Sequence, residues 1–266
     1  MTALSHTLTD SATMLRRNLR HMQRYPSLTL MLLGMPVVFL LLFVYVFGGT
    51  MGAGMGGPSG GGRSEYIDYV APGIILMTIA AFAQGTAVSV AMDMTEGIVA
   101  RFRTMAIARA SVLTGHVIGA MLQTVLGLAV VLGVAVLIGY RPDASPVEWL
   151  AAAGVLMLFA FALTWLTVAL GLAADSVETA SNTPMPLMLL PFLSSGFVPT
   201  DSMPTGLRWF AEYQPFTPLI ETVRGLLMGT PIGGSAAQTV AWCTGLTLVA
   251  YLWARKLYNR DPSASR

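Results

Sequence analysis

Six long stretches of this chain contain no Asp, Glu, Lys or Arg, and they constrain its fold more than any other feature. They cover residues 28–47, 69–92, 111–139, 149–174, 179–198 and 237–254. A helix needs roughly 17–25 apolar residues to cross a bilayer core, and each charge at its centre costs about 2.5–3.5 kcal/mol. Charged residues make up only 11% of the 266 residues, whereas a soluble domain carries about 25%. We therefore expect an all-α polytopic membrane protein with six transmembrane helices.

The distribution of basic residues between these stretches predicts the orientation. With the N-terminus inside, the inside segments hold 11 of the 15 Lys and Arg residues and the outside segments hold 4. Short cytoplasmic loops are enriched in Lys and Arg. We expect one transmembrane domain over 1–266 in the inner (plasma) membrane, with both termini cytoplasmic. It comprises a cytoplasmic N-terminus (1–27), a membrane domain (28–254) and a cytoplasmic tail (255–266).

Two of the connecting segments have a distinct composition. Residues 13–24 alternate apolar side chains with four arginines at near-helical spacing, which predicts an amphipathic helix on the cytoplasmic surface. The same arginines also fit a simple positive-inside anchor. Residues 48–62 are glycine-rich and predict a flexible external loop.

The glycine-rich segment is not a phosphate-binding loop. A Walker A motif requires Gly-Lys followed by Ser or Thr, and the single lysine of the chain is Lys256. We therefore expect no catalytic residue, metal or cofactor in this chain, and any ATP chemistry must come from another polypeptide.

The fifth stretch is interrupted by Pro184, Pro186 and Pro191, followed by Ser194, Ser195 and Gly196. Proline removes a backbone donor and disrupts a helix, and broken backbone in a membrane requires burial in protein or a wet cavity. Either a kinked helix or a discontinuous element that enters and exits near the outer leaflet fits this pattern.

Residues 200–229 mix aromatic and charged side chains, and Pro215 and Pro218 divide them. They predict two short amphipathic helices at the external interface, re-entrant into the bilayer. Thr217 and Pro218 suit the N-cap and first turn of the second helix.

Several polar and flexible side chains lie inside the apolar stretches. Gln84, Thr86, Ser89, Gln123 and Thr124 either hydrogen-bond between helices or contact a substrate. Likewise Met31, Met35, Phe39 and Phe43 in the first stretch either pack or line an apolar, adaptable path.

Three segments near the C-terminal end resemble the signature of type-2 ABC-transporter permeases, most of all the daunorubicin-resistance (drug exporter) branch. They are LSSGFVPTDSMP at 193–204, LRWFAEYQP at 207–215 and PLIETVRGLLMG at 218–229. The segment DMTEGIVARFRTMAIARA at 93–110 is similar to the family's loop between the second and third spans. It departs from the family at Ala106, where proline is common.

The resemblance implies a working unit of two permease subunits, which we expect to be identical, and two cytoplasmic ABC ATPase subunits that bind ATP and Mg. It also implies that the 96–108 segment is a coupling helix that docks on the ATPase. In that segment Ile98, Phe102 and Met105 form one apolar face with a charged rim, although a solvated loop is the alternative. The candidate coupling residues are Glu96, Gly97, Ile98, Arg101, Phe102, Arg103 and Met105.

By the same resemblance, the broken fifth span and the external helices form an outer gate and part of the dimer interface. The gate residues are Pro191, Gly196, Phe197, Pro199, Pro204, Pro215, Pro218, Glu221, Arg224 and Gly225. The candidate substrate path, lined mainly by spans one, two and five, comprises Met35, Phe39, Phe43, Gln84 and Thr86.

The expected function is export of a lipophilic or amphiphilic small molecule, with a lipid or lipid-linked polysaccharide as the alternative cargo. No nucleic-acid partner is expected.

An intramembrane protease is disfavoured because His116 is the one histidine inside an apolar stretch and no histidine follows it in the sequence. An ion-coupled carrier is disfavoured because the acidic residues lie at or beyond the ends of the spans. An energy-independent channel or carrier remains the alternative from another class.

Overall fold

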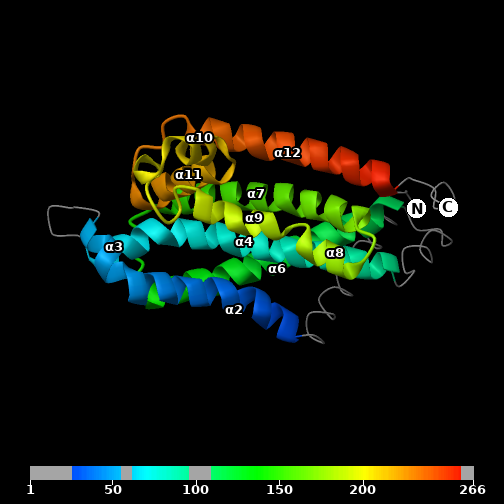
Figure 1. Ribbon diagram of the computed structural model, residues 1–266, viewed down its shortest axis with the longest axis horizontal. Coiled ribbons are helices and arrows are strands. Elements are labelled where there is room, and N and C mark those ends of the chain that lie inside the picture. Colours follow the sequence, from blue (N-terminus) through cyan, green and yellow to red (C-terminus); the bar gives the residue numbers. More distant parts are fainter. Residues whose placement is uncertain (1–25, 55–61, 96–108, 259–266) are drawn as a thin grey trace.

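The computed structural model describes residues 26–54, 62–95 and 109–258, and within them it contains helices and no strands. The long helices run side by side along one axis (Figure 1). They are α2 (Pro26–Leu42), α4 (Arg63–Thr95), α6 (Arg109–Leu137), α7 (Pro146–Ala173) and α12 (Ser235–Tyr258). The prediction of an all-α bundle is confirmed.

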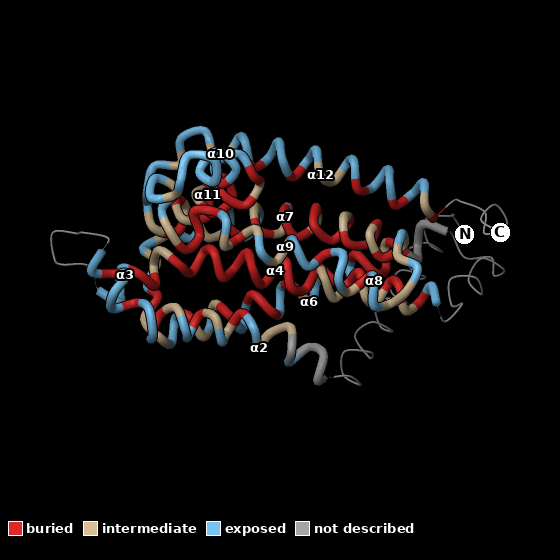
Figure 2. The backbone as a smooth tube through the Cα atoms, in the orientation of Figure 1, coloured by how far each residue is buried: buried red, intermediate tan, exposed pale blue. Residues whose placement is uncertain are grey.

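Helix α4 forms the centre of the bundle. Its most apolar window is 78% buried inside the protein, and in Figure 2 its tube is mostly red between α2 on one side and α7 on the other. The corresponding window of α2, with its continuation, is only 22% buried. Exposed leucines, valines and aromatics cover the outer faces of α2 and α12. Apolar side chains on these faces suit contact with lipid hydrocarbon. The backbone suits it too, because a helix satisfies its own backbone hydrogen bonds.

Four helical segments of the described residues are long and apolar enough to cross a membrane. They are Leu32–Gly54, Arg63–Thr95, Leu113–Leu137 and Pro146–Ala173, and they correspond to the first four predicted spans. The predicted total of six is therefore not confirmed. The fifth stretch is divided into pieces too short to cross alone. The 24-residue α12 is not among these four segments.

The described part of the glycine-rich segment differs from the prediction of a loop over 48–62. The first span passes through a π-helical turn, η1 (Phe43–Phe47), and continues beyond residue 47 as helix α3 (Gly48–Gly54). Glycine is needed at position 52, because a Cβ there would lie 2.3 Å from the carbonyl oxygen of Gly62 on the returning chain. The glycines thus permit close approach of two backbones.

The fifth stretch is broken as predicted. It consists of α8 (Val177–Asn182), α9 (Met185–Leu189) and the 3-10 turn η2 (Leu190–Leu193), and Figure 1 shows these pieces following one another along the bundle. Pro184 is the N-cap of α9 and Pro191 lies in η2. Both prolines lie at breaks, as expected from their missing donor.

The chain then forms η3 (Thr200–Ser202), α10 (Thr205–Tyr213) and α11 (Phe216–Met228). The prediction of two helices is confirmed, but their start was misplaced. α11 begins at Phe216 after Pro215, with no side-chain cap, so Thr217 is not the N-cap and Pro218 lies within the first turn. Only α10 lies on the surface, because Phe216, Leu219, Ile220 and Val223 of α11 are all fully buried.

The two ends of the bundle are different. Helices α3, α10 and α11 gather at one end, whereas the start of α2 and the ends of α4 and α12 lie at the other (Figure 1). The segments predicted to be external therefore share one end of the molecule.

Candidate functional site

The broken segment ends in a turn over residues 194–196 that the side chains of Gln214, Thr217 and Arg224 hold in place. Gln214, between α10 and α11, donates from Nε2 to the carbonyl oxygens of Leu190 (3.0 Å) and Leu193 (2.7 Å). The backbone N–H of Ser195 donates to Thr217 Oγ1 at 3.2 Å. These hydrogen bonds to side chains replace the backbone hydrogen bonds that an unbroken helix would make.

Arg224 of α11 joins this turn to α4. Its Nη2 donates to the carbonyl oxygens of Tyr69 (3.0 Å) and Ser195 (2.8 Å), and its guanidinium lies 4.0 Å from the centre of the Tyr69 ring. Burial lowers the pKa of Arg224, and the nearby Tyr69 and Glu221 oppose this shift. Arginine nevertheless remains a cation at neutral pH. Its charged guanidinium therefore joins α11, α4 and the turn over residues 194–196.

The turn touches α4 through two glycines. A Cβ on Gly73 would lie 2.9 Å from the carbonyl oxygen of Gly196, which is closer than real side chains allow. Gly196 is itself one of the predicted gate residues. The two backbones therefore meet with no side chain between them.

Below the turn, an aromatic cluster connects the first span with the broken segment. We define it as Phe39, Phe43, Phe192 and Phe197. The rings of Phe43 and Phe197 are 4.6 Å apart, those of Phe192 and Phe197 stack at 4.6 Å, and Phe39 meets Phe192 edge-on at 5.4 Å. The structure thus brings the predicted path residue Phe43 onto the predicted gate residue Phe197, and Phe39 onto Phe192 beside it.

The remaining predicted gate residues have local roles. Pro204 and Pro215 precede α10 and α11 as their N-caps, and Pro199 is exposed before η3. Glu221 accepts a hydrogen bond from Ser235 Oγ at 2.8 Å, at the start of α12. Gly225 makes room for Ile232 and the Thr230 carbonyl, which a Cβ would meet at 2.4 and 2.9 Å. These residues shape the end of the bundle where α3, α10 and α11 gather, whereas Arg224 and Gly196 join it to α4.

The other path residues lie nearer the opposite end. Gln84 Nε2 donates to the Ser181 carbonyl of α8 at 2.7 Å, the interhelical bond that was one of its two predicted roles. Thr86 and Thr124 donate to carbonyls within their own helices. Met35 is half exposed on α2. The predicted coupling residues at 96–105 and the predicted N-terminal amphipathic helix lie outside the described residues.

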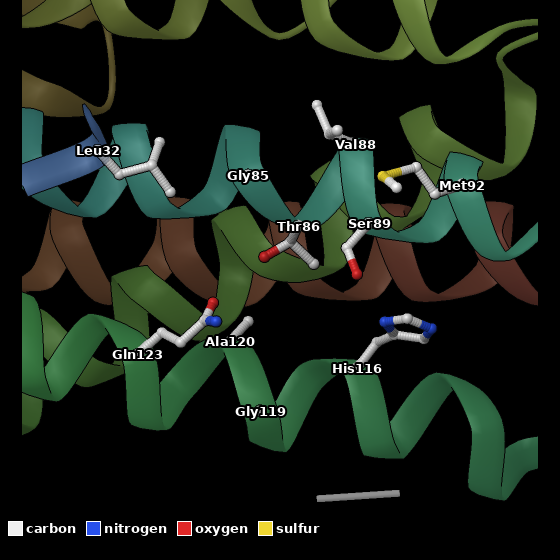
Figure 3. Close-up of a pocket in the computed structure, with 10 residues that line it drawn as sticks. All are labelled: Leu32, Gly85, Thr86, Val88, Ser89, Met92, His116, Gly119, Ala120 and Gln123. Atoms are coloured by element: carbon white, nitrogen blue, oxygen red, sulfur yellow. The ribbon is translucent and has the colours of Figure 1, made fainter. Parts of the chain in front are cut away.

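Thr86 also lines a cavity between α2, α4 and α6 (Figure 3). Its polar lining comes from Thr86 and Ser89 on α4 and from His116 and Gln123 on α6. His116 Nε2 lies 3.1 Å from Asp93 Oδ2, and both side chains are nearly buried. This pair connects α4 and α6 close to the points where α4 ends and α6 begins.

Several residues of these arrangements lack a sequence signal for their contacts. Gln214, Thr217 and Tyr69 act through contacts with residues far away in the chain, which no local pattern reports. His116 and Asp93 are 23 positions apart. Their one sequence signal is that each is an ionisable residue inside or directly after an apolar stretch.

Comparison with known proteins is consistent with these features. Residues 10–228 match the model of the ABC-2 type transporter family. The chain is 29% identical over 260 residues to the daunorubicin resistance ABC transporter permease protein DrrB1 of Streptomyces coeruleorubidus, covering 97% of this chain and 87% of that protein. It is 23% identical over 163 residues to the probable doxorubicin resistance ABC transporter permease protein DrrC of Mycobacterium tuberculosis, covering 61% of this chain and 59% of that protein.

Proposed function

This chain belongs to the ABC-2 type transporter family, and from that premise we propose that it is the membrane subunit of an ATP-driven exporter of lipophilic or amphiphilic, drug-like molecules. The observation that carries the proposal is the similarity to a daunorubicin resistance permease along 97% of the chain. The apolar, helical bundle agrees with such a role. Hydrolysis of ATP belongs to a separate ATPase subunit with its Mg, and a second copy of this chain completes the permease.

The proposed topology has six crossings with both termini in the cytoplasm. The four long apolar segments supply the first four crossings, the α8–α9–η2 series supplies the fifth and α12 the sixth. The clustering of α3, α10 and α11 at one end (Figure 1) supports this arrangement, because the predicted external segments then share one side of the membrane.

The aromatic cluster and the turn at 194–196 form the outer gate in this proposal. Rings at van der Waals distance exclude water and ions while the gate is closed. Arg224 and Gln214 stabilise the turn that carries Phe197. Separation of Phe43 from Phe197 then opens an apolar passage near the outer leaflet, which suits a lipophilic cargo.

We propose that residues 96–108 transmit ATPase movement to the bundle. The segment connects α4 to α6, so a displacement there acts on both helices. Its apolar face at Ile98, Phe102 and Met105 with charges around it fits a groove on a partner protein better than it fits water.

The experiment that tests this function is co-purification with the co-expressed ATPase, followed by ATP-dependent uptake of daunorubicin into inverted membrane vesicles. We expect a stoichiometric ATPase subunit and uptake that stops without ATP. Recovery of the chain alone, with no nucleotide-dependent uptake, would favour an energy-independent channel or carrier.

Two pairs of variants separate coupling from gating. We expect Glu96→Arg and Phe102→Ala to lose uptake because the ATPase no longer drives the bundle, although the protein still inserts.

We expect Glu221→Ala and Arg224→Ala to retain the ATPase subunit and ATP hydrolysis but to lose uptake. A buried hydrogen bond to a charged group is worth about 1.5–3 kcal/mol, so Arg224→Ala is the more damaging of that pair. Normal uptake by the first pair, or loss of the ATPase from the second pair, would contradict these roles.

A further inference from the structure

The cavity between α2, α4 and α6 has the features of a binding site for a polar group. It has a volume of about 60 Å³, and a buried water molecule needs about 10–15 Å³ of such a volume. The cavity therefore has room for several waters or for a small substituent of a larger molecule.

Two side chains on its wall have hydrogen-bonding capacity to spare. Ser89 and Gln123 line the cavity, and Figure 3 shows them pointing from α4 and α6 into the space between the helices. Neither makes a hydrogen bond within the described part of the chain. By contrast, the neighbouring Gln84 and Thr124 are satisfied by carbonyl oxygens. Because unpaired polar groups are costly in a membrane interior, a polar occupant is expected here.

The His116–Asp93 pair adds a strongly polar boundary at one end of the cavity. His116 lines it directly, is 7% exposed and is 3.1 Å from the Asp93 carboxylate. Ionisable residues in membrane helices are rare and usually mark a substrate or ion pathway. A pair needed for packing alone would not require an adjoining cavity.

The rest of the lining is apolar. It includes Leu32 of α2 and Val88 and Met92 of α4. Gly85 lets α2 approach, since a Cβ at that position would lie 2.9 Å from Leu32 Cδ1. A molecule bound here meets both polar groups and apolar side chains.

We propose that this cavity is the head-group subsite of the cargo. It takes the hydroxyl- or amino-bearing group of an amphiphile through Ser89 and Gln123, while the apolar part of the molecule lies along α2. The inference rests on the proposed export function and specifies its substrate class. In the proposed orientation the subsite lies near the cytoplasmic end, where an exporter takes up its cargo.

The test compares two probes on the purified complex with its ATPase subunit, without nucleotide. Daunorubicin carries an amino sugar and its aglycone lacks it, so the pair isolates the contribution of the polar group. We expect Gln123→Leu and Ser89→Ala to weaken daunorubicin binding about five- to tenfold, the size of one lost hydrogen bond. Aglycone binding should change less than about twofold. Titration of anthracycline fluorescence measures both affinities.

Thr124→Val is the matched control, because Thr124 is buried on the same helix and bonds only to its own backbone. We expect it to bind both probes as the unsubstituted protein does. If Gln123→Leu fails to assemble, the smaller Ser89→Ala change decides the result.

Equal effects on both probes, or no effect in either variant, would overturn the subsite and leave a cavity that holds only water. Absence of daunorubicin binding to an unsubstituted complex that contains an active ATPase would also overturn it, while the exporter assignment stands. Failure to recover any ATPase would instead count against the proposed function.

Discussion

At the scale of single residues, Gly73 lies at a tight backbone contact between α4 and the turn over residues 194–196. Its missing side chain lets α4 touch the turn at residue 196, and Gly73→Ala places a Cβ 2.9 Å from a backbone oxygen. Backbone cannot move aside as a flexible side chain can, so we expect a loss of about 1–3 kcal/mol of stability. Thermal unfolding in detergent, with uptake as a second measurement, checks this expectation.

Gly154→Ala is the control for that substitution. Gly154 also lies inside a long helix, but a Cβ there has no atom within 4 Å. Alanine favours helix over glycine by about 1 kcal/mol, so this variant should be as stable as the unsubstituted protein or more so. Equal destabilisation of both variants would mean that the glycine contact is not what matters.

At the scale of elements, the broken fifth segment depends on partners outside itself. Gln214 supplies the donor for two carbonyl oxygens of η2. We expect Gln214→Leu to leave both without a bond and to cost roughly 1–3 kcal/mol. Hydrogen–deuterium exchange over residues 185–196 should become faster, while exchange in α7 stays unchanged.

The exposed Gln238 of α12 provides the comparison for this element. Gln238→Leu adds the same apolar side chain without removing a described hydrogen bond. We expect no change in exchange over residues 185–196. Unchanged exchange in Gln214→Leu as well would show that the prolines alone maintain the broken geometry.

At the scale of the whole molecule, the two ends of the bundle make the orientation testable. Cys243 is 2% exposed, so the native thiol should add little background to labelling. Thr205 begins α10 and Lys256 lies in the last turn of α12, and both are exposed. Helix α10 and the end of α12 lie at opposite ends of the bundle (Figure 1). We expect a membrane-impermeant maleimide to label Thr205→Cys in intact cells and Lys256→Cys only after permeabilisation. The reverse pattern would invert the proposed topology.

Much of the architecture follows from the sequence alone. The absence of charge from long stretches determined that the chain is a helical membrane protein, since hydrocarbon penalises every unpaired charge. The prolines at 184 and 191 marked the breaks of the fifth segment because a missing backbone donor is a local property. The division of residues 200–229 into two helices followed for the same reason, although their exact starts did not.

The tertiary structure alone decided which of these residues meet. Arg224 reaches the carbonyl oxygen of Tyr69, 155 positions away, and the Phe43 ring meets Phe197. Ser89 and Gln123 share a cavity because α4 and α6 pack side by side. Composition and periodicity indicate whether a segment lies in lipid or in water and which secondary structure it forms. Both are local properties of the chain. Contacts between distant segments depend on how helices pack, and a single sequence does not encode that packing as a readable local pattern.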